Sequence, residues 1–574
     1  MAILDWIKKY EWLAVGALLL CFVIQSLIAA THLSLTYDEK RHLPNGYLYL
    51  RTGTAMNIAT PILGEAWAAL PLMFISADLP DPELGQIAFT DAFFHENDLR
   101  MVTMLGRVMM ILLSIALGLL IFWWSRTLYG TSAALLALGL YSFNPVILGY
   151  GPLVLMDLPL ALAILAFAYA AGKLCTEGNW WWLVATGALF GIAQVIKYPA
   201  VLLVPITLLV WIVLYFRTKI HFRFLSQQRA LSYLLSVILI FAIGWFIVNA
   251  TYGFQGTFSP LRVSLAKDPY LDQEKYALRQ GISTVFPSLP PAQERMITFA
   301  AERLPLFLPY HYVLNFLYQV KTAQDNPENF LHGQIFRGGK WYYYLFVFIL
   351  KQPLAILTLL GMAILLLPKT KNIGSAKWFL LIPSLFFLVY FSLSARQIAL
   401  RYVLMVFPFL FIGMSSILTA QMKSPHWQIL ILALFGAGVL STVSTAPDYV
   451  SFANEAVQST AWQMMVEGNL DMGQGLLMLK SYMEERRIDS VALSYFGDID
   501  PARYGLRFEN YCPYGRMKLQ PFRTEPTNGF YAVSVTNLQL KERECLAWLQ
   551  RYSPEDNLGS LLIYRISDLT PATS

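Results

Sequence analysis

Ionisable residues cluster directly after the first apolar stretch of the sequence. The segment Tyr37–His42 reads Tyr-Asp-Glu-Lys-Arg-His, so Asp38, Glu39 and His42 would lie at a membrane boundary. Charged side chains in that place cost free energy unless they reach the lipid headgroups. Their presence therefore indicates a functional role. A carboxylate such as that of Asp38 can take a proton from a hydroxyl group, which is general-base catalysis. The alternative interpretation is an interfacial cluster that the headgroups solvate.

A second acid, Asp157, opens a later apolar stretch with the sequence Leu-Met-Asp-Leu-Pro. An acid at a membrane boundary among apolar neighbours indicates a functional role. Pro159, however, would lie in the first turn of the following helix, and that arrangement favours Asp157 as a helix N-cap. Taken alone, Asp157 is better interpreted as a cap.

Basic residues change this interpretation. Lys197, Lys351, Arg396 and Arg401 lie at the ends of apolar stretches or interrupt them, on the same predicted side of the membrane as the two acids. Each could snorkel to the headgroups. Together with the acids they predict a pocket for an anionic substrate, such as a phosphate whose lipid tail lies among the helices. Arginine would give such a phosphate bidentate contacts and lysine a point charge.

The composition of the chain indicates whether water or lipid surrounds most of the protein. Of its 574 residues, 56% are hydrophobic and 14% are charged, whereas soluble globular proteins have about 25% charged residues. The formal net charge of +6 comes from short loops rather than from a basic run. We therefore expect a membrane protein with lipid among its partners, and we expect no nucleic acid among them.

Apolar stretches long enough to cross a bilayer recur along the chain and predict a polytopic α-helical membrane protein. The first stretch is too long for a secretory signal peptide and predicts an uncleaved helix. Short basic loops all fall on one side if the chain crosses eleven times, with external loops 32–102 and 251–341 and an external tail. The expected helices cover residues 11–31, 103–124, 131–149, 156–172, 180–196, 199–216, 231–250, 342–367, 377–394, 401–419 and 427–446.

The loops and the tail carry patterns of their own. Ile62–Ala77 and Ala300–Leu317 favour short helices that lie along the membrane interface. We expect residues 1–446 to form a transmembrane domain and residues 447–574 to form a small external α/β domain. Its expected elements are a helix at Leu477–Arg487 and strands at Ser490–Phe496, Tyr531–Thr536 and Leu561–Ile566.

The tail also contains two of the four cysteines, Cys512 and Cys545. An external tail lies in an oxidising compartment, where disulfides persist. A disulfide between these two residues is one hypothesis, and two free thiols are the other.

The order of these motifs resembles the GT-C superfamily of polyprenyl-phosphate-sugar-dependent glycosyltransferases, and within it glycosyltransferase family 39. That family includes protein O-mannosyltransferases and the lipid A aminoarabinose transferase. Each motif is short, and their order and spacing over nearly the whole chain carry the resemblance. The matching residues are Asp38-Glu39, His42, Gly46, Pro61, Ala69–Leu72, Arg107, Phe143–Pro145, Gly151, Asp157, Pro159, Lys197-Tyr198, Lys351–Pro353, Arg401-Tyr402, Pro408, Tyr449, Phe452, Asn454-Glu455, Asn469–Asp471, Gly473-Gln474 and Ser494–Gly497.

The resemblance implies a role for each candidate residue. Asp38 would be the base for the acceptor hydroxyl, Glu39 would support it, and Asp157 would hold donor or acceptor. The donor would be a polyprenyl-phosphate-linked sugar and the acceptor a glycan, a lipid or a protein. Transfer would invert the anomeric carbon at an active site on the periplasmic side of the cell membrane. The implied substrate-binding residues are His42, Lys197, Tyr198, Lys351, Arg396, Arg401 and Tyr402.

Two segments depart from the family pattern. Family members often have His-Pro-Pro or Lys-Pro-Pro where this chain has Thr60-Pro61-Ile62, which puts contacts from this loop to the donor in doubt. The usual Asp-Trp-Gly-Gln of the tail is Asp471–Gln474, with Met at the second position. That change concerns packing within the tail.

Two alternatives concern the use of the acids and the class of protein. Asp38, Glu39 and Asp157 could hold a divalent cation, but the number of ligands favours a metal-independent enzyme without a cofactor. The external histidines His95, His311 and His332 lack zinc spacing. A lipid or glycan transporter or flippase would also have many spans and buried charges. Such proteins usually contain internal repeats, and this sequence has none that we detect.

Overall fold

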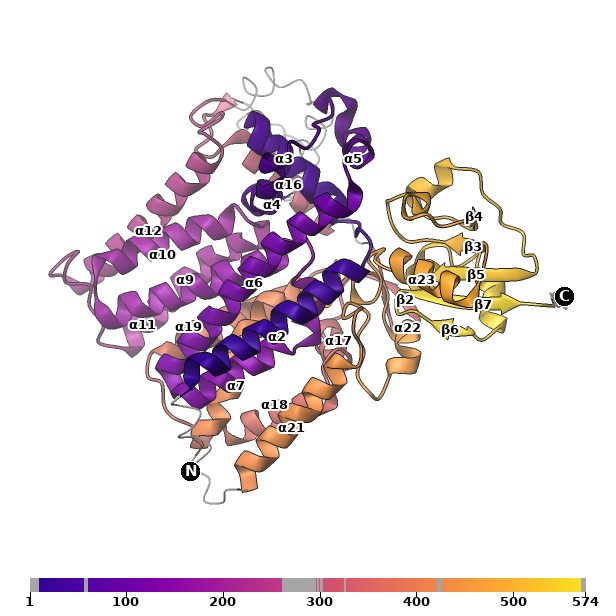
Figure 1. Ribbon diagram of the computed structural model, residues 1–574. Coiled ribbons are helices and arrows are strands. Elements are labelled where there is room, and N and C mark those ends of the chain that lie inside the picture. Colours follow the sequence, from indigo (N-terminus) through magenta and orange to yellow (C-terminus); the bar gives the residue numbers. More distant parts are fainter. Residues whose placement is uncertain are drawn as a thin grey trace.

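A bundle of helices forms most of the molecule, and a small sheet forms its C-terminal part (Figure 1). The computed structural model describes residues 10–55, 60–260, 303–324, 327–420 and 426–568, together with Met296 and Phe299. The bundle helices are α2 (Glu11–His32), α6 (Leu99–Tyr129), α7 (Thr131–Ser142), α8 (Pro145–Tyr150), α9 (Asp157–Glu177), α10 (Trp180–Gln194), α11 (Leu203–Arg217), α12 (Arg229–Thr251), α17 (Tyr343–Leu350), α18 (Leu354–Leu366), α19 (Ala376–Ser392), α20 (Phe407–Ser415) and α21 (His426–Val443).

Length and composition identify the chain as an integral membrane protein. In the described part of the chain, seven helices or helical runs are long and apolar enough to cross a bilayer, and further apolar helices are shorter. α9 lies inside the bundle, since 72% of its most apolar window is buried, whereas 17% is buried for α21. An outer helix such as α21 presents apolar side chains to lipid. The count of eleven crossings stays a prediction.

Two of the expected spans are each broken into two helices, which corrects the prediction of continuous helices at 131–149 and 342–367. α7 ends before Pro145, and the Asn144 side chain accepts hydrogen bonds from the backbone of Val146 at 3.0 Å and Ile147 at 3.3 Å. Proline has no N–H to donate and favours the first turn of a helix. Pro353 likewise separates α17 from α18.

The two long loops fold into short elements on one end of the bundle. The first contains α3 (Glu39–Thr52), α4 (Leu63–Ala69), a 3-10 turn at Leu70–Phe74 and α5 (Gly85–Glu96). Helices expected at Ile62–Ala77 are therefore confirmed. The second loop contains α16 (Tyr310–Gln324) and a hairpin of β1 (Glu328–Leu331) and β2 (Gln334–Arg337). α16 overlaps the expected helix at Ala300–Leu317, of which residues 300–302 lie outside the described residues.

The tail forms a five-stranded mixed sheet in the order β4-β3-β5-β7-β6. β3 pairs in parallel with β4 and β5, and β7 pairs antiparallel with β5 and β6. The expected helix and three strands are confirmed, whereas β4 and β6 were not predicted. The elements are α22 (Ala461–Met464), α23 (Leu476–Arg486), β3 (Val491–Ser494), β4 (Phe508–Asn510), β5 (Gly529–Ser534), β6 (Asp556–Asn557) and β7 (Leu561–Ile566).

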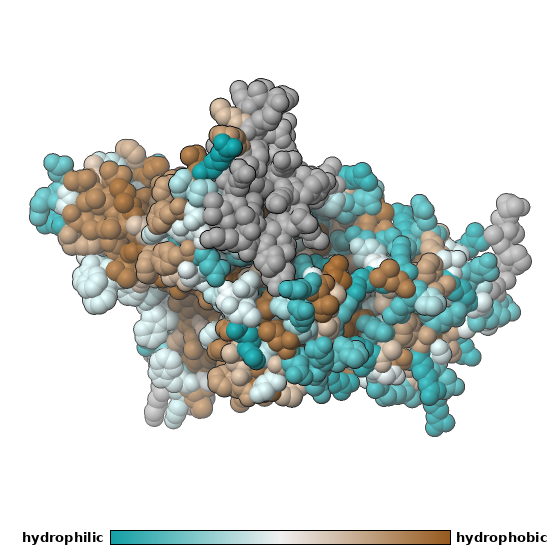
Figure 2. Space-filling view, turned by 90° about the horizontal axis from the view of Figure 1, so that it is seen from above, coloured by the Kyte–Doolittle hydropathy of each residue, from teal (hydrophilic) through white to brown (hydrophobic). Residues whose placement is uncertain are grey.

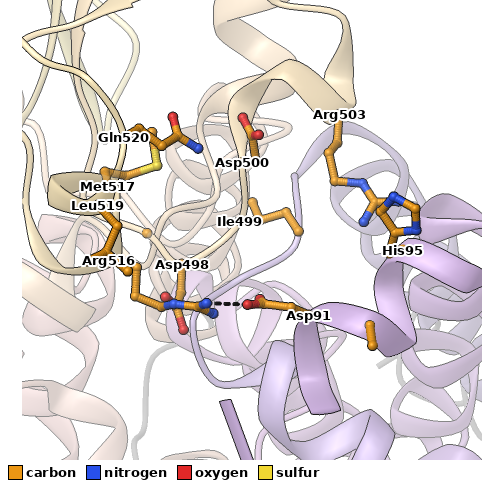
Figure 3. Close-up of a pocket in the computed structure, with 12 residues that line it drawn as sticks. Asp91, His95, Asp498, Ile499, Asp500, Arg503, Arg516, Met517, Leu519 and Gln520 are labelled. Carbon is orange, nitrogen blue, oxygen red and sulfur yellow. Dashed lines mark ion pairs between the residues drawn. The ribbon is translucent and has the colours of Figure 1, made fainter. Parts of the chain in front are cut away.

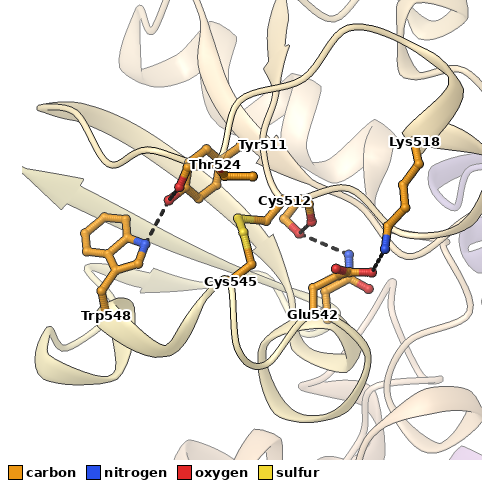
Figure 4. Close-up of a disulfide and its surroundings, with 9 residues drawn as sticks. Tyr511, Cys512, Lys518, Thr524, Glu542, Cys545 and Trp548 are labelled. Carbon is orange, nitrogen blue, oxygen red and sulfur yellow. Dashed lines mark hydrogen bonds and ion pairs between the residues drawn. A yellow bond between two sulfur atoms is a disulfide. The ribbon is translucent and has the colours of Figure 1, made fainter.

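A disulfide joins Cys512 to Cys545, with 6.0 Å between their Cα atoms (Figure 4). The alternative of two free thiols is therefore wrong. Beside the disulfide, the Trp548 indole donates a hydrogen bond to the Tyr511 hydroxyl at 2.8 Å. The disulfide closes a loop of 33 residues on one side of the sheet.

The tail also holds the chain segment that leads from α2 into α3. The Ser34 hydroxyl donates to the Gly473 carbonyl at 2.9 Å, and the Tyr37 N–H donates to the Met472 carbonyl at 3.1 Å. Seen from above, hydrophobic residues gather over the helical part and hydrophilic residues over the C-terminal part (Figure 2). The first ionisable cluster of the sequence therefore lies where the apolar bundle meets the polar tail.

Candidate functional site

Four charged side chains from four separate elements meet at one end of the bundle. Arg401, in the 3-10 helix Leu400–Val406, lies 2.7 Å from a carboxylate oxygen of Asp38 and 3.8 Å from one of Asp157. Lys197, which follows α10, lies 2.6 Å from the other oxygen of Asp157. We call Asp38, Asp157, Lys197 and Arg401 the acid–base cluster. The sequence predicted all four as site residues, and the fold brings them together.

The acid–base cluster is open on the side of Asp38. The exposed fraction of the side chain is 27% for Asp38, 19% for Lys197, 12% for Arg401 and 2% for Asp157. A substrate could therefore approach Asp38 and the two cations, while Asp157 forms the floor. Two acids and two cations neutralise one another, so an anionic group that enters must compete with the carboxylates for the cations.

Asp157 begins α9 but does not cap it. Its Oδ1 accepts a hydrogen bond from Lys197 at 2.6 Å, and its Oδ2 has no hydrogen-bond partner among the described residues. The expected N-cap role is thus wrong, because a side-chain cap would accept from the first backbone N–H groups of the helix. Asp157 instead lies beside Lys197 and Arg401, where it can fix the positions of both cations.

The cations determine the protonation state of Asp38. Burial by itself would raise the pKa of Asp38, but the neighbouring positive charges, that of Arg401 first, outweigh burial and lower the pKa to about 2. His42, one helical turn further along α3, also lowers this pKa. Asp38 is therefore ionised at neutral pH, and its basicity depends on how strongly Arg401 is engaged elsewhere.

Tyr402 supports the two cations from one side. The Lys197 Nζ lies 5.4 Å from the centroid of the Tyr402 ring, and the Arg401 Cζ lies 5.8 Å from it. Cations at this distance from an aromatic face are attracted to it. The sequence predicted Tyr402 as a substrate-binding residue, and the structure brings it to the acid–base cluster.

Glu39 lies next to Asp38 in the chain but points away from the cluster. Its carboxylate accepts hydrogen bonds from the Arg107 guanidinium at 2.7 and 2.8 Å, and its side chain is fully buried. The backbone N–H groups of Thr36 and Val154 donate to the same carboxylate. These hydrogen bonds occupy the Glu39 carboxylate, which does not pair with the cations of the acid–base cluster.

Three other predicted residues do not join the cluster. Lys351 is buried, and its Nζ donates to the carbonyls of Val450 and Asn469, both at 2.6 Å. Arg396 donates to a carbonyl of α16, and the Tyr198 hydroxyl donates to the carbonyl of Tyr312 at 3.0 Å. In the described ranges, neither Lys351 nor Arg396 forms an ion pair with an acid of the cluster. In the sequence, Lys351 and Arg396 show the same pattern as Lys197 and Arg401, a cation at the end of an apolar stretch or within one.

Glu65 is a buried acid next to His42 that the sequence did not predict as a site residue. Glu65 of α4 lies 2.7 Å from the His42 Nδ1 and also accepts a hydrogen bond from the Asn45 amide. Burial raises the pKa of Glu65, although hydrogen bonds from His42 and Asn45 oppose that effect. Its signal was available, since Glu65 is the one acid in the apolar run 61–75. His42 therefore stands between Asp38 and this second carboxylate.

Side chains that could bind a metal ion do not gather at one place in the described residues. Within the described ranges, no three side chains among His, Cys, Asp and Glu lie together in a way that could hold a metal ion.

Comparisons with known proteins give one family match. Residues 99–247, about a quarter of the chain, match the family described as dolichyl-phosphate-mannose-protein mannosyltransferase. The match covers α6 to most of α12 and includes Asp157 and Lys197. The chain thus resembles family 39 within the GT-C superfamily, as its motifs predict. No curated protein matches the chain.

Solved structures give distant likenesses. ArnT from Cupriavidus metallidurans bound to undecaprenyl phosphate is 12% identical over 97% of this chain and 98% of its own, with a TM-score of 0.48. The Saccharomyces cerevisiae protein O-mannosyltransferase Pmt1-Pmt2 complex bound to the sugar donor is 18% identical over 45% of this chain and 37% of its own, with a TM-score of 0.35. The Archaeoglobus fulgidus oligosaccharyltransferase is 11% identical over 95% and 72%, with a TM-score of 0.47. At TM-scores below 0.5, none of these likenesses supports a functional statement.

Proposed function

We propose that this protein transfers a sugar from a polyprenyl-phosphate carrier to a hydroxyl group of an acceptor. The observation that carries the proposal is the acid–base cluster, in which one arginine lies near both carboxylates at the end of a membrane bundle. Apolar helices around it would accommodate the lipid part of such a donor. The family match, which covers Asp157 and Lys197, supports the same class of reaction.

Binding of the donor would exchange one set of anions for another. The lipid phosphate would take hydrogen bonds from Arg401 and a charge contact from Lys197, in place of those that Asp38 and Asp157 provide in the free protein. Guanidinium groups match phosphate oxygens in a bidentate way, and such charge-assisted bonds are about twice as strong as neutral ones. Tyr402 would keep both cations in place during this exchange.

The same exchange would activate the base. The pKa of Asp38 is about 2 in the free protein, after the charge of Arg401 has outweighed burial. Once the phosphate engages Arg401, the lowering effect on Asp38 weakens while burial continues to raise its pKa. Asp38 therefore becomes a stronger base only after a donor has bound.

Transfer would proceed as a direct displacement with inversion. The acceptor oxygen attacks the anomeric carbon, the bond from that carbon to the phosphate oxygen breaks, and the lipid phosphate leaves with the electron pair. Asp38 takes the acceptor proton as the new bond forms. The departing phosphate gains negative charge, and the two cations stabilise that gain more in the transition state than in the ground state.

The distribution of charge along the sequence supports one side of the membrane for the acid–base cluster. The short basic loops of the sequence would lie in the cytoplasm, and the opposite end of the bundle carries the first loop with Asp38. We therefore place the acid–base cluster on the extracytoplasmic face of a cell membrane. The unit 447–574 would cover it from outside, in line with the hydrogen bonds from the Ser34–Tyr37 segment to the tail.

Replacing Asp38 by Asn tests the proposal. Full-length protein in lipid nanodiscs is incubated with dolichyl-phosphate mannose and then with other polyprenyl-phosphate sugars, and the released polyprenyl phosphate is measured. We expect turnover by the wild type and a loss of about 10²–10⁴-fold in Asp38→Asn, as for other general bases. The exposed Asp489→Asn variant is the matched control and should retain wild-type turnover. Unchanged turnover in Asp38→Asn would overturn the assignment.

A further inference from the structure

A cavity lies between α5 and the tail, and no residue of the acid–base cluster lines it (Figure 3). Its volume is about 440 Å³, within the range of about 300–1,000 Å³ that small-molecule sites occupy. One wall is α5, with Asp91 and His95. The other walls are tail segments that contribute Asp498, Asp500 and Arg503. The cavity therefore exists only where the first loop and the tail meet.

Ion pairs connect the lining of this cavity to α3, the helix that follows Asp38. The buried Lys40 of α3 lies 2.6 Å from Asp91 and 3.6 Å from Asp498, and Arg516 of the tail also pairs with Asp91. Residues two apart on a helix point to opposite sides. Asp38 and Lys40 therefore face opposite sides of α3, so the acid–base cluster and the cavity lie back to back across its first turn.

Tyr37 provides a second connection between the two places. Burial raises the pKa of its hydroxyl, and the negative charges of Asp498 and Asp38 raise it further, against Arg41. The Tyr37 hydroxyl therefore lies within electrostatic range of both carboxylates.

The charges of the cavity balance. Asp91, Asp498 and Asp500 supply three negative charges, and Arg503, Arg516 and the underlying Lys40 supply three positive ones. A phosphate would need an excess of cations, and a polycation would need an excess of acids. The cavity has neither, which favours a ligand without net charge.

The lining offers both kinds of hydrogen-bonding group. Arg503 is exposed and has no side-chain hydrogen bond or ion pair within the described part of the chain, and it points toward His95 across the cavity mouth. Carboxylates accept hydrogen bonds and guanidinium groups donate them. Sugar hydroxyls do both. Aliphatic side chains such as Ile499 and Leu519 offer apolar contact to the carbon faces of a sugar ring.

We propose that this cavity is a carbohydrate subsite, which holds a neutral, hydroxyl-rich segment of the acceptor. The inference rests on the proposed transferase function for its biological meaning. Its physical content, which is the binding of neutral glycan between α5 and the tail, is independent of catalysis.

Glycan capture by full-length protein in nanodiscs tests this subsite. Neutral water-soluble glycans, prepared from envelopes of cells that lack the protein, are passed over immobilised nanodiscs, and the retained glycans are quantified by mass spectrometry. The Asp38→Asn protein is used beside the wild type, so that capture is measured without turnover. We expect equal capture by both. Loss of an arginine hydrogen bond should weaken capture by Arg503→Ala about tenfold.

Three further variants complete the test. Ala92→Trp places a bulky ring in the cavity from α5 and should abolish capture, whereas Ala92→Ser should not. Arg507→Ala removes an exposed arginine from the same tail segment outside the cavity and should capture as the wild type does. Thermal unfolding checks that each variant is folded. The proposal is overturned if the wild type retains no glycan, or if Arg503→Ala and folded Ala92→Trp retain it as well as the controls do. Failure of the transferase proposal would appear separately, as turnover that does not depend on Asp38.

Discussion

Asp38 and Glu39 are neighbours in the chain, and each pairs with an arginine at 2.7 Å. The two pairs differ in how deeply they are buried and in their other partners. Glu39 is fully buried, and Arg107 and two backbone N–H groups donate to it. Asp38 is 27% exposed, and its Arg401 is shared with Asp157. Neither oxygen of Glu39 can gain a new partner without losing an old one. Asp38 can bind a substrate group in place of Arg401, and Arg401 can bind one in place of Asp38.

This difference separates an anchor from a site. A fully satisfied buried ion pair fixes the chain, because removing one partner leaves an uncompensated charge in an apolar place. A partly exposed pair with shared partners can open at small cost and so can bind or react. The Glu39–Arg107 pair thus fixes the start of α3. The fixed start of α3 in turn positions Asp38 beside Arg401.

The largest expected effect is on the stability of the anchor. Glu39→Gln should lower the free energy of unfolding by about 3–5 kcal/mol, since Arg107 would remain charged and buried without its counter-ion. Asp38→Asn should change stability far less, because Asp38 is partly exposed and Arg401 keeps Asp157 nearby as a counter-ion. Thermal unfolding of both variants in nanodiscs measures the contrast. Equal destabilisation by the two would remove the distinction between anchor and site.

A second comparison concerns two lysines that look alike in sequence. Lys197→Met should weaken binding of polyprenyl phosphate about tenfold, since one charge contact to the phosphate is lost. Lys351→Met should leave that affinity unchanged and should destabilise the protein by about 1–3 kcal/mol, because two buried carbonyls lose their donor. Lipid-phosphate titrations and thermal unfolding check both. A loss of affinity in a folded Lys351→Met protein would place Lys351 in the site after all.

A third acid shows what burial does without a cation. In the described part of the chain, no basic side chain pairs with Asp471 of the tail, and burial raises its pKa to about 7 against a hydrogen bond from the Gly473 backbone. The folded protein then holds this proton between the ordinary pKa of 3.8 and about 7, while the unfolded chain has lost it. Stability should therefore fall as pH rises through that window and level off above it.

Asp471→Asn removes this titration and keeps a side chain of the same shape. The melting temperature of the wild type should decrease by a few degrees between about pH 4 and pH 7, and that of Asp471→Asn should change less over the same range. Scanning calorimetry or intrinsic fluorescence measures both curves. Parallel curves would show that Asp471 is not the titrating group.

Sequence patterns predicted those parts of the structure that depend on local order. Apolar runs predicted the helices, and a short strand-like run predicted β7 at Leu561–Ile566. β4 and β6 have three and two residues, which is too short for a pattern to emerge. The break at Asn144-Pro145 follows from proline geometry, but continuous apolar sequence on both sides concealed it.

The site was predictable in residue type but not in pairing. The acids and cations near the membrane boundary included all four members of the acid–base cluster. Which acid meets which cation depends on contacts between segments far apart in the chain, as between Asp38 and Arg401. For the same reason, sequence could not tell Lys351, which binds carbonyls of the tail, from Lys197. Glu65 was missed because its partner His42 lies in another helix.

Binding of polyprenyl phosphate alone tests most directly whether carboxylates and lipid phosphate exchange places on the cations. The affinity is measured by titration into nanodiscs that hold the wild type, Asp38→Asn or Arg401→Ala. The exchange predicts that Asp38→Asn binds more tightly than the wild type, because a competing carboxylate charge is gone, and that Arg401→Ala binds between about tenfold and a hundredfold more weakly. Weaker binding by Asp38→Asn, or unchanged binding by a folded Arg401→Ala, would contradict the account.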